Sequence, residues 1–434
     1  MDDIRNVFVF GLDDFHRAQL ATIRDADRYR FHPLLSHDEA VHPEHFAVPE
    51  MLATSEAILH AFDGRVDAVC TYWDFPTSTL VPILRERFDL PGPRLEAVLR
   101  LEHKYWARLE QRAVVPELVP PFQALDPFTE DPEAALEVPY PFWIKPVKAH
   151  SSHLGFRIHG PRDFARALVR IRRRIHVFAE PFDAVLAHAE LPARIAPVRG
   201  DHCIVEGIIS AGHQCTLEGY VHRGRTEIYG IVDSFREGRH RSCFQRYQYP
   251  SALPRRVQRR MCDAAARVMD RAGYDGAPFN MEFFWNRSRD ELWLLEVNAR
   301  CSKSHSPLFH LVDGASHFQV MAALGVGEAP AFPHREGTHR VAAKFMLRAF
   351  EDAIVTRVPQ QADLERFRRR FPEAGVRLLV HEGQQLSHMK FQDSYSFELA
   401  ELFLGARDRK ALLARYREAR PLLGIELRPL DEAA

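Results

Sequence analysis

Hydrophobic and polar residues alternate in blocks along the first 95 residues of the chain. The segment 5–11, RNVFVFG, predicts a buried strand that ends in a glycine, and a polar, helix-like stretch follows it to about Arg24. Residues 66–72 predict a second strand, and residues 77–88 predict a helix. Strands that alternate with helices are typical of a parallel sheet covered on both faces. Only Gly11 stands after the first strand, so the glycine fingerprint of a dinucleotide site is missing.

The rest of the chain follows a similar pattern of apolar runs and amphipathic stretches. Proline and acidic residues are concentrated in residues 114–142, which we expect to mark a domain crossing. The later apolar runs predict strands at 142–147, 156–158, 203–209, 340–350 and 376–381, and a pair of strands within 278–300. Helical periodicity predicts helices at 161–176, 254–272, 362–371 and 407–419.

Composition and charge exclude several classes of protein. A chain of 434 residues is too long for one typical core, so two to four domains are expected. With 58 basic and 59 acidic residues the net charge is −1, which does not favour binding to nucleic acid or anionic lipid. No apolar run is long enough to cross a membrane, and the acidic start does not resemble a signal peptide. Six cysteines without a CxxC pair favour reduced thiols in the cytoplasm.

The segment 292–300, LWLLEVNAR, carries polar residues at the end of an apolar strand. Successive side chains of a strand point to opposite faces, so we expect Glu296, Asn298 and Arg300 to share one face. The preceding apolar segment, FNMEFFW, also contains a charged residue among apolar neighbours, Glu282. The short link between the two segments predicts a β-hairpin.

A hairpin in which paired residue numbers add up to about 576 would place Glu282 opposite Leu294, on the face of Glu296. The two glutamates would then lie diagonally, within roughly 7–8 Å. Two buried carboxylates so close need neutralisation. Structural salt bridges to nearby arginines are one interpretation. A divalent cation is the other, because two carboxylates and an amide suit Mg²⁺, which usually shares its coordination with substrate phosphates.

Groups that could hold phosphates occur earlier in the chain. Lys145 ends the strand at 142–147 beside a proline, and the loop KAHSSHLG at 148–155 offers hydroxyl groups and backbone amides that can fold over phosphate oxygens. Lys104 lies in a predicted helix among charged residues, where a solvated surface position is the simpler interpretation. Glu206 stands alone in the apolar strand CIVEGII, whose backbone could pair with an adenine edge.

The order of these parts resembles the ATP-grasp superfamily, chiefly its carboxylate–amine ligases. The shared features are a helix lysine, Lys-Pro at a strand end, a small-residue loop and a glutamate in an apolar strand. They continue with GHQCTLEG at 212–219 and, most specifically, the final E…E-V-N-A-R that begins at Glu282. The resemblance covers about residues 1–330.

The resemblance implies roles for particular residues. Nucleotide contacts would come from Lys104, Lys145, Ser151 and Ser152, from the adenine-reading hinge Glu206, Gly207, Ile208 and Ile209, and from Gln214. Ligands of Mg²⁺ or Mn²⁺ would be Glu282, Glu296 and Asn298. Catalysis would rest on Lys145 and on Arg300, which would face the reacting carboxyl or acyl phosphate. Substrate carboxylate contacts are also expected from Arg239 and Arg241, between the hinge and the metal strands.

Two positions depart from the family pattern. The family's mobile loop is usually glycine-rich, whereas residues 148–155 contain serines and histidines, so the loop geometry is left open. Gln214 stands where an acidic residue often helps to hold the nucleotide, which leaves the ribose contacts open.

The resemblance implies a multidomain α/β and α+β protein with the ATP-grasp fold: a Rossmann-like N-terminal domain, a two-lobed ATP-binding domain and a C-terminal α+β domain. The expected boundaries are 1–95 for the Rossmann-like domain, 96–137 for a helical linker, 138–202 for the lid subdomain, 203–330 for the catalytic subdomain and 331–434 for the C-terminal domain.

The implied function is an ATP-dependent ligase. It would join a carboxylate, favoured to be an amino acid, to an amine through an acyl phosphate, with ATP and Mg²⁺ or Mn²⁺. Its partners would be small molecules, and a homodimer is compatible with the sequence. A biotin-carboxylase-like enzyme that activates bicarbonate is an alternative, although no Ala-Met-Lys-Met biotin site occurs. The second alternative is a nucleotide-binding regulator without turnover. The complete set of expected metal ligands together with Arg300 argues against it.

Overall fold

The computed structural model describes residues 4–41, 43, 45–149, 153–209, 212–237, 243–389 and 396–430. The chain divides into two compact units. The first comprises residues 1–229, 253–303 and 318–331, and the second comprises residues 230–252, 304–317 and 332–434. Among the described residues, no helix combines the length and the apolar character needed to span a bilayer.

The first unit begins with a three-stranded parallel sheet in the order β2-β1-β3, made of β1 (Arg5–Phe10), β2 (Tyr29–Leu34) and β3 (Ala68–Cys70). The helices of this part are α1 (Asp14–Leu20), η1 (Ala26–Arg28), α2 (His37–Val41), α3 (Val48–His60) and α4 (Thr77–Arg87). The carboxyl ends of parallel strands meet at one edge of a sheet, where ligand sites of such folds form. Asp74 follows β3 at that edge.

Two helices, α5 (Leu95–Glu102) and α6 (Lys104–Val114), lead through η2 (Pro116–Leu118) to a four-stranded antiparallel sheet. Its order is β4-β7-β5-β6, with β4 (Phe122–Leu125), β5 (Phe142–Pro146), β6 (Phe156–Ile158) and β7 (Cys203–Gly207). The predicted helix at 161–176 is confirmed as α7 (Pro161–Arg174), and a further helix, α8 (His176–Leu186), follows it. Helix α7 buries its apolar stripe, Phe164, Ala167, Leu168 and Ile171, in one cluster with β5.

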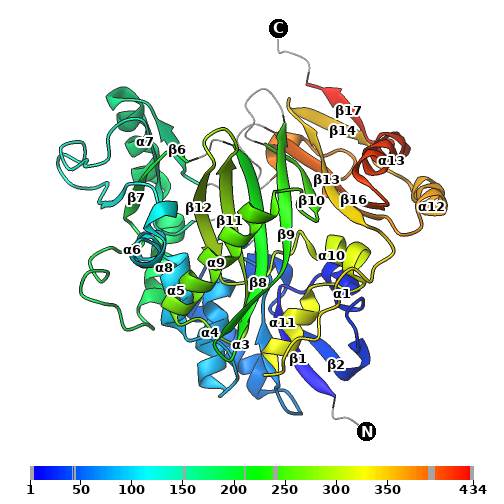
Figure 1. The fold of residues 1–434 in the computed structure, drawn as a ribbon, viewed down its shortest axis with the longest axis horizontal. Helices are drawn as coiled ribbons and strands as arrows, with labels where there is room; N and C mark the ends of the chain where they lie inside the picture. The colour runs from blue at the N-terminus through cyan, green and yellow to red at the C-terminus, as the bar shows by residue number, and fades with distance from the viewer. Residues whose placement is uncertain are drawn as a thin grey trace. The chain divides into compact units, whose positions relative to one another are not determined.

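The third sheet segment of the first unit holds the strands that carry the predicted metal ligands. Strands β8 (His213–His222), β11 (Ala277–Asn286) and β12 (Glu291–Asn298) are antiparallel, in the order β12-β11-β8 (Figure 1). Helix α9 (Arg255–Ala272) buries an apolar face of seven residues, and α11 (Phe318–Gly325) is entirely buried. Methionine and cysteine side chains link α9 to β8, at Met261 and Cys215. Strand β12 ends this sheet, and no strand of the described residues pairs with its outer edge.

The second unit is built on β9 (Arg225–Glu237), within which the chain passes from the first unit to the second. The strand order continues β9-β10-β13-β16-β15, with β10 (Cys243–Tyr249), β13 (Val341–Ala349), β15 (Gly375–Leu378) and β16 (Phe397–Ala406). A two-stranded sheet pairs β14 (Ala353–Arg357) with β17 (Glu426–Pro429). The helices are α10 (Ser306–Asp313), α12 (Gln361–Arg370), η3 (Leu386–His388) and α13 (Arg409–Leu422). Strands β13 and β16 form a core with Phe367 and Leu412.

The expected domain boundaries stay predictions, but two features of the fold cross them. The four-stranded sheet takes β4 from the predicted linker and β7 from the predicted catalytic subdomain. The second unit adds residues 230–252 and 304–317 to the predicted C-terminal domain. Both features depend on pairing between distant segments, which local periodicity does not encode.

Candidate nucleotide and metal site

The two predicted metal carboxylates face each other directly across the β11–β12 ladder. Glu282 pairs with Glu296, and two residues further along Asn280 pairs with Asn298. The predicted register, with Glu282 opposite Leu294, is therefore wrong. The ladder shifts by one residue beyond Glu282, so that Phe283 pairs with Leu294.

Burial of apolar side chains explains the shift. Met281 and Phe283 are fully buried on one face of β11, and their partners Val297 and Leu294 are buried too. Because Val297 and Leu294 are three residues apart, strict alternation cannot place both on one face. At the irregularity one extra residue of β12 has no partner in the β11–β12 register, and Glu296 lies opposite Glu282.

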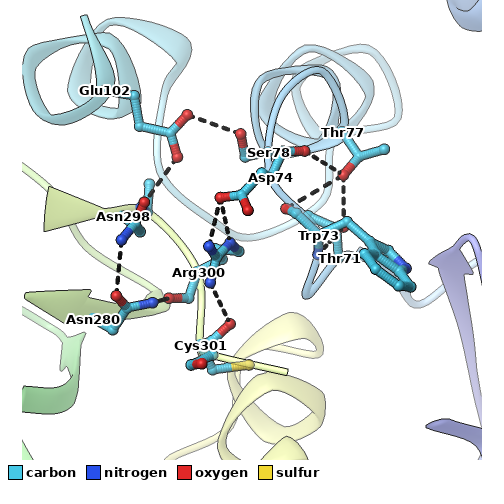
Figure 2. A network of polar contacts seen from close by, with 12 residues as sticks. Thr71, Trp73, Asp74, Thr77, Ser78, Glu102, Asn280, Asn298, Arg300 and Cys301 are labelled. Carbon is cyan, nitrogen blue, oxygen red and sulfur yellow. Dashed lines mark hydrogen bonds and ion pairs between the residues drawn. The ribbon is translucent and has the colours of Figure 1, made fainter. Parts of the chain in front are cut away.

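Asparagine 280 fixes the orientation of the third predicted ligand, Asn298. The Asn280 Nδ2 group donates to the backbone carbonyl of Arg300 at 3.0 Å, so its oxygen is the atom left to accept. That oxygen accepts a hydrogen bond from Asn298 Nδ2 at 2.9 Å (Figure 2). The amide nitrogen of Asn298 is therefore occupied, and its oxygen is presented for another partner. Asn280 is not among the residues predicted from the sequence, although it shares a strand face with Glu282.

The donor set fits a hard cation that is shared with a bound anion. Glu282 and Glu296 supply carboxylates and Asn298 an amide oxygen, the ligand types of Mg²⁺. Within the described ranges no three acidic, histidine or cysteine side chains form a metal-binding group. A cation held here thus needs further oxygen ligands, which nucleotide phosphates supply in many magnesium sites. Gln214, expected among the nucleotide contacts, donates to Glu282 Oε2 at 2.8 Å.

The predicted phosphate lysines belong to the same cluster of charges. Lys104 begins α6, and its Nζ group donates to the carbonyl of Ala149 at 2.9 Å. Burial lowers the pKa of Lys104 to about 8; the attraction of Glu296 opposes this shift, and the like charges of Lys145 and Lys148 add to it. Lys104 is therefore withdrawn from solvent and interacts electrostatically with Glu296, so the simpler interpretation as a solvated surface lysine is wrong.

Lys145 is paired with the hinge glutamate. Its Nζ lies 2.6 Å from Glu206 Oε2, and Arg108 Nε donates to Glu206 Oε1 at 2.5 Å. Burial alone would raise the pKa of Glu206, but these two cations lower it to about 2. Glu206 therefore stays ionised, and its side chain links Lys145 to Arg108. Any contact with adenine at this position is left to its backbone.

A second lysine–glutamate pair was not foreseen. Lys148 Nζ lies 2.6 Å from Glu102 Oε2, and both side chains are buried. The same carboxylate accepts from Ser78 Oγ at 2.8 Å, and its other oxygen accepts from the backbone amide of Ala299 at 3.1 Å (Figure 2). The pair thus anchors the start of the 148–155 loop to the end of the metal strand. The sequence signal for this pair is the second lysine of KPVK, Lys148.

Arg300 lies two residues beyond the end of β12 and pairs with Asp74, in the loop that follows β3 of the N-terminal sheet. Its Nε and Nη2 donate to Asp74 Oδ1 at 3.0 and 2.5 Å (Figure 2). Burial alone would lower the pKa of Arg300, and Asp74 raises it above the usual value. The guanidinium therefore faces an anion, the carboxylate of Asp74, in this structure.

The predicted hinge borders a cavity of about 370 Å³. Glu206 and Gly207 end β7, and Ile208 and Ile209 continue into the cavity wall. The other lining residues come from the β11–β12 hairpin: Asn286, Ser288, Arg289, Glu291 and Trp293. Its volume lies within the usual range for small-molecule pockets. Ser151, Ser152, Arg239 and Arg241 lie outside the described residues.

Comparisons with known proteins agree with this geometry. Residues 138–306 match the family of ATP-grasp domains. A search of the sequence against curated proteins gave no match. Among solved structures, the L-amino acid ligase from Bacillus licheniformis aligns with 99% of this chain and 100% of its own, at a TM-score of 0.71 and 14% identity.

Two further structures show how widely the fold is shared. Phosphoribosylglycinamide synthetase from Anaerococcus prevotii has a TM-score of 0.62 and 12% identity, with 99% of this chain and 100% of that chain covered. Biotin carboxylase from Campylobacter jejuni has a TM-score of 0.65 and 15% identity, with 98% and 93% covered. At such identities the likeness establishes the fold. This protein therefore has the ATP-grasp fold, and its residues 138–306 are an ATP-grasp domain.

Proposed function

We propose that this protein is an ATP-dependent ligase that joins a carboxylate to an amine and releases ADP and phosphate. One observation carries the proposal: the lysine of α6 and the carboxylates of the β11–β12 hairpin form a single electrostatic cluster. Lysines attract phosphate oxygens, whereas carboxylates repel them unless a cation lies between. A site with both is suited to a nucleotide held together with Mg²⁺.

The proposed roles follow from position. Lys104 and Lys145 bind the phosphate chain, and Glu282, Glu296 and Asn298 hold Mg²⁺ or Mn²⁺. When bound, the metal ion neutralises charge that develops on the phosphates. Glu206 to Ile209 and the adjoining cavity are proposed to receive adenine. Ser151 and Ser152 are proposed to cover the phosphates.

The proposed reaction has two steps. A carboxylate oxygen of the substrate attacks the γ-phosphorus of ATP, the bond to the β–γ bridging oxygen breaks, and ADP leaves. The amine nitrogen then attacks the carbonyl carbon of the acyl phosphate, phosphate leaves with the bonding electrons, and the amine loses a proton. Arg300 stabilises the negative charge of the intermediate. The substrate carboxylate first replaces Asp74 as the partner of this guanidinium.

An amino acid is the proposed carboxylate. The full-length likeness to an L-amino acid ligase supports this choice, because the alignment extends over both chains from end to end. Arg239 and Arg241 are proposed to contact the substrate carboxylate. Bicarbonate is the other acid to test, since biotin carboxylase shares the fold.

The test is a screen of carboxylate and amine pairs for ADP release with Mg²⁺ and ATP, repeated with hydroxylamine in place of the amine. We expect one carboxylate to give ADP, phosphate and a hydroxamate, all dependent on ATP. AMP and pyrophosphate as products would overturn the acyl phosphate mechanism. ADP release with bicarbonate alone would favour the biotin-carboxylase-like reaction. Nucleotide binding without any turnover across the screen would favour a regulator.

A further inference from the structure

Arg108 occupies a central position that the proposed reaction does not by itself explain. It lies on α6, one helical turn after Lys104, and is 3% exposed. Its Nη1 and Nη2 groups donate to the carbonyls of Leu294 and Leu295, each at 2.8 Å, and Nη1 also donates to Gln111 at 2.7 Å. Its Nε donates to Glu206. Every nitrogen of the guanidinium is therefore engaged.

The two carbonyls belong to the part of β12 where the ladder shifts register. Leu294 and Leu295 immediately precede Glu296, and the shift lies between the pairs formed by Glu296 and Leu294. A bulged strand leaves backbone groups outside the regular ladder, and buried carbonyls need donors. Strand β12 is also terminal in its sheet, and within the part of the chain that the structure describes no further strand supplies them. The fork of the Arg108 guanidinium supplies both donors at once.

The Nε atom of the same guanidinium binds the four-stranded sheet that carries Lys145. Glu206 ends β7 and accepts from Arg108 Nε, while its second oxygen pairs with Lys145. One planar group thus connects the backbone before Glu296 to the carboxylate that holds Lys145. The distance between a proposed metal ligand and a proposed phosphate ligand is fixed through this single side chain.

We propose that Arg108 is a positioning residue that sets Glu296 and Lys145 at the spacing required for a Mg²⁺ ion and the phosphate it bridges. The proposal rests on the proposed function, because it assumes that the cluster binds ATP with Mg²⁺. Arg108 itself touches neither nucleotide nor metal. Its effect reaches the site through the backbone of β12 and the carboxylate of Glu206.

Arg108→Lys is the sharpest variant. A lysine keeps the positive charge beside Glu206, but a single ammonium group cannot reproduce the planar fork to two carbonyls and a carboxylate. The matched control is Arg271→Lys on α9, where an arginine at the surface pairs with Glu110 at 2.6 Å. Both variants replace an arginine by a lysine beside a glutamate, and only one of them alters β12.

The experiment measures ATP binding by isothermal titration calorimetry, once in excess Mg²⁺ and once in EDTA, together with the melting temperature. We expect Arg108→Lys to weaken Mg²⁺-dependent ATP binding about tenfold or more, the effect typical of partners that orient metal ligands. Binding in EDTA should change much less, and Arg271→Lys should bind as the wild-type protein does. A folded Arg108→Lys protein with wild-type affinity in Mg²⁺ overturns the proposal, as does an equal loss with and without Mg²⁺.

A second variant covers the case in which Arg108→Lys does not fold. The double change Arg108→Met and Glu206→Gln removes both charges of the buried Arg108–Glu206 pair. Lys145 loses its carboxylate partner as well, but its side chain is half-buried and keeps contact with solvent. It should fold and still lose the advantage that Mg²⁺ gives to ATP binding. A double variant that retains this advantage contradicts the role of Arg108. If the wild-type protein binds no ATP in Mg²⁺, the proposed function fails together with this inference, whereas wild-type binding with unaffected variants overturns the inference alone.

Discussion

Glu206 and Glu296 lie in the same cluster of charges, but the fold treats them differently. Glu206 is buried and receives a lysine and an arginine, which lower its pKa to about 2. Glu296 is half-buried and faces another carboxylate, Glu282, across the ladder. In the described part of the chain Glu296 forms no ion pair with a basic residue.

Glu206 is therefore a structural carboxylate, whereas Glu296 is available to bind a cation. A buried charge that the protein neutralises itself holds elements together and has little capacity left for a ligand. Glu282 and Glu296 face each other across the ladder, Gln214 donates to Glu282, and the charge of Lys104 attracts Glu296. A divalent cation between Glu282 and Glu296 would relieve their repulsion, which is why we propose the metal site at Glu296 and a structural link between β7 and α6 at Glu206. The predictions below test this division.

The largest effect is expected from Glu296→Gln. The change removes one of two carboxylates that the metal needs, so kcat should fall at least about 100-fold. The melting temperature without nucleotide should hold or rise, because the repulsion with Glu282 is relieved. Steady-state kinetics and thermal melting measure both, with the exposed Glu227→Gln as control. Near-normal turnover in the folded Glu296→Gln protein is incompatible with the metal assignment.

Glu206→Gln should act on stability instead. It leaves Arg108 and Lys145 without their shared anion, so the free energy of unfolding at pH 7 should fall by about 3–5 kcal/mol. The lowered pKa of Glu206 contributes stability that is fully present above its ordinary value of 4.5 and is lost as pH falls through about 2. Urea denaturation should therefore show the gap between wild type and variant shrinking below pH 4.5. A gap that stays constant down to pH 2 speaks against a buried charged Glu206.

Asn280→Ala should leave the two carboxylates in place and disturb only Asn298. Without Asn280 the amide of Asn298 loses the partner that fixes its orientation, so the concentration of Mg²⁺ needed for half-maximal activity should rise about tenfold. A titration of activity with Mg²⁺ at saturating ATP measures it. If kcat alone falls and the Mg²⁺ requirement is unchanged, Asn280 supports the strand rather than the ligand.

The pKa of Lys104, lowered to about 8, predicts a modest dependence on pH. Below pH 8 the lysine is charged and attracts phosphates; above it the charge is lost and the KM for ATP should rise several-fold. Lys104→Arg keeps the charge and should remove this rise. The same pH profile in both proteins would place the titration elsewhere.

The smallest effect on activity is expected from Cys301→Ser, one residue beyond Arg300. The thiol is fully buried in an apolar cluster with Val9, Cys70 and Phe318. The KM for ATP and kcat should change less than about twofold. The new hydroxyl should cost about 1–3 kcal/mol of stability, seen in urea denaturation. A loss of most activity in a folded variant would indicate that the Cys301 thiol takes part in the reaction.

Local pattern alone determined much of this protein. The strand at Arg5–Phe10, the helix at Arg255–Ala272 and the hairpin around Glu282 follow from periodicity and turn residues, which act between near neighbours in the chain. The chemistry of E…E-V-N-A-R was visible for the same reason, since two carboxylates in apolar strands are costly without a partner. The resemblance to the ATP-grasp fold then implied the arrangement of the parts.

Tertiary structure decided the register and the partners. The pairing of Glu282 with Glu296 depends on which apolar side chains bury together, and Val297 and Leu294 satisfy that demand only through an irregular ladder. Arg108 meets Glu206 across 98 residues, and Arg300 meets Asp74 across 226. Such contacts arise because helix α6 and the N-terminal sheet bring charges to strand ends that are distant in the sequence. No local pattern carries that information, since the free energy of each pair exists only once the chain has folded.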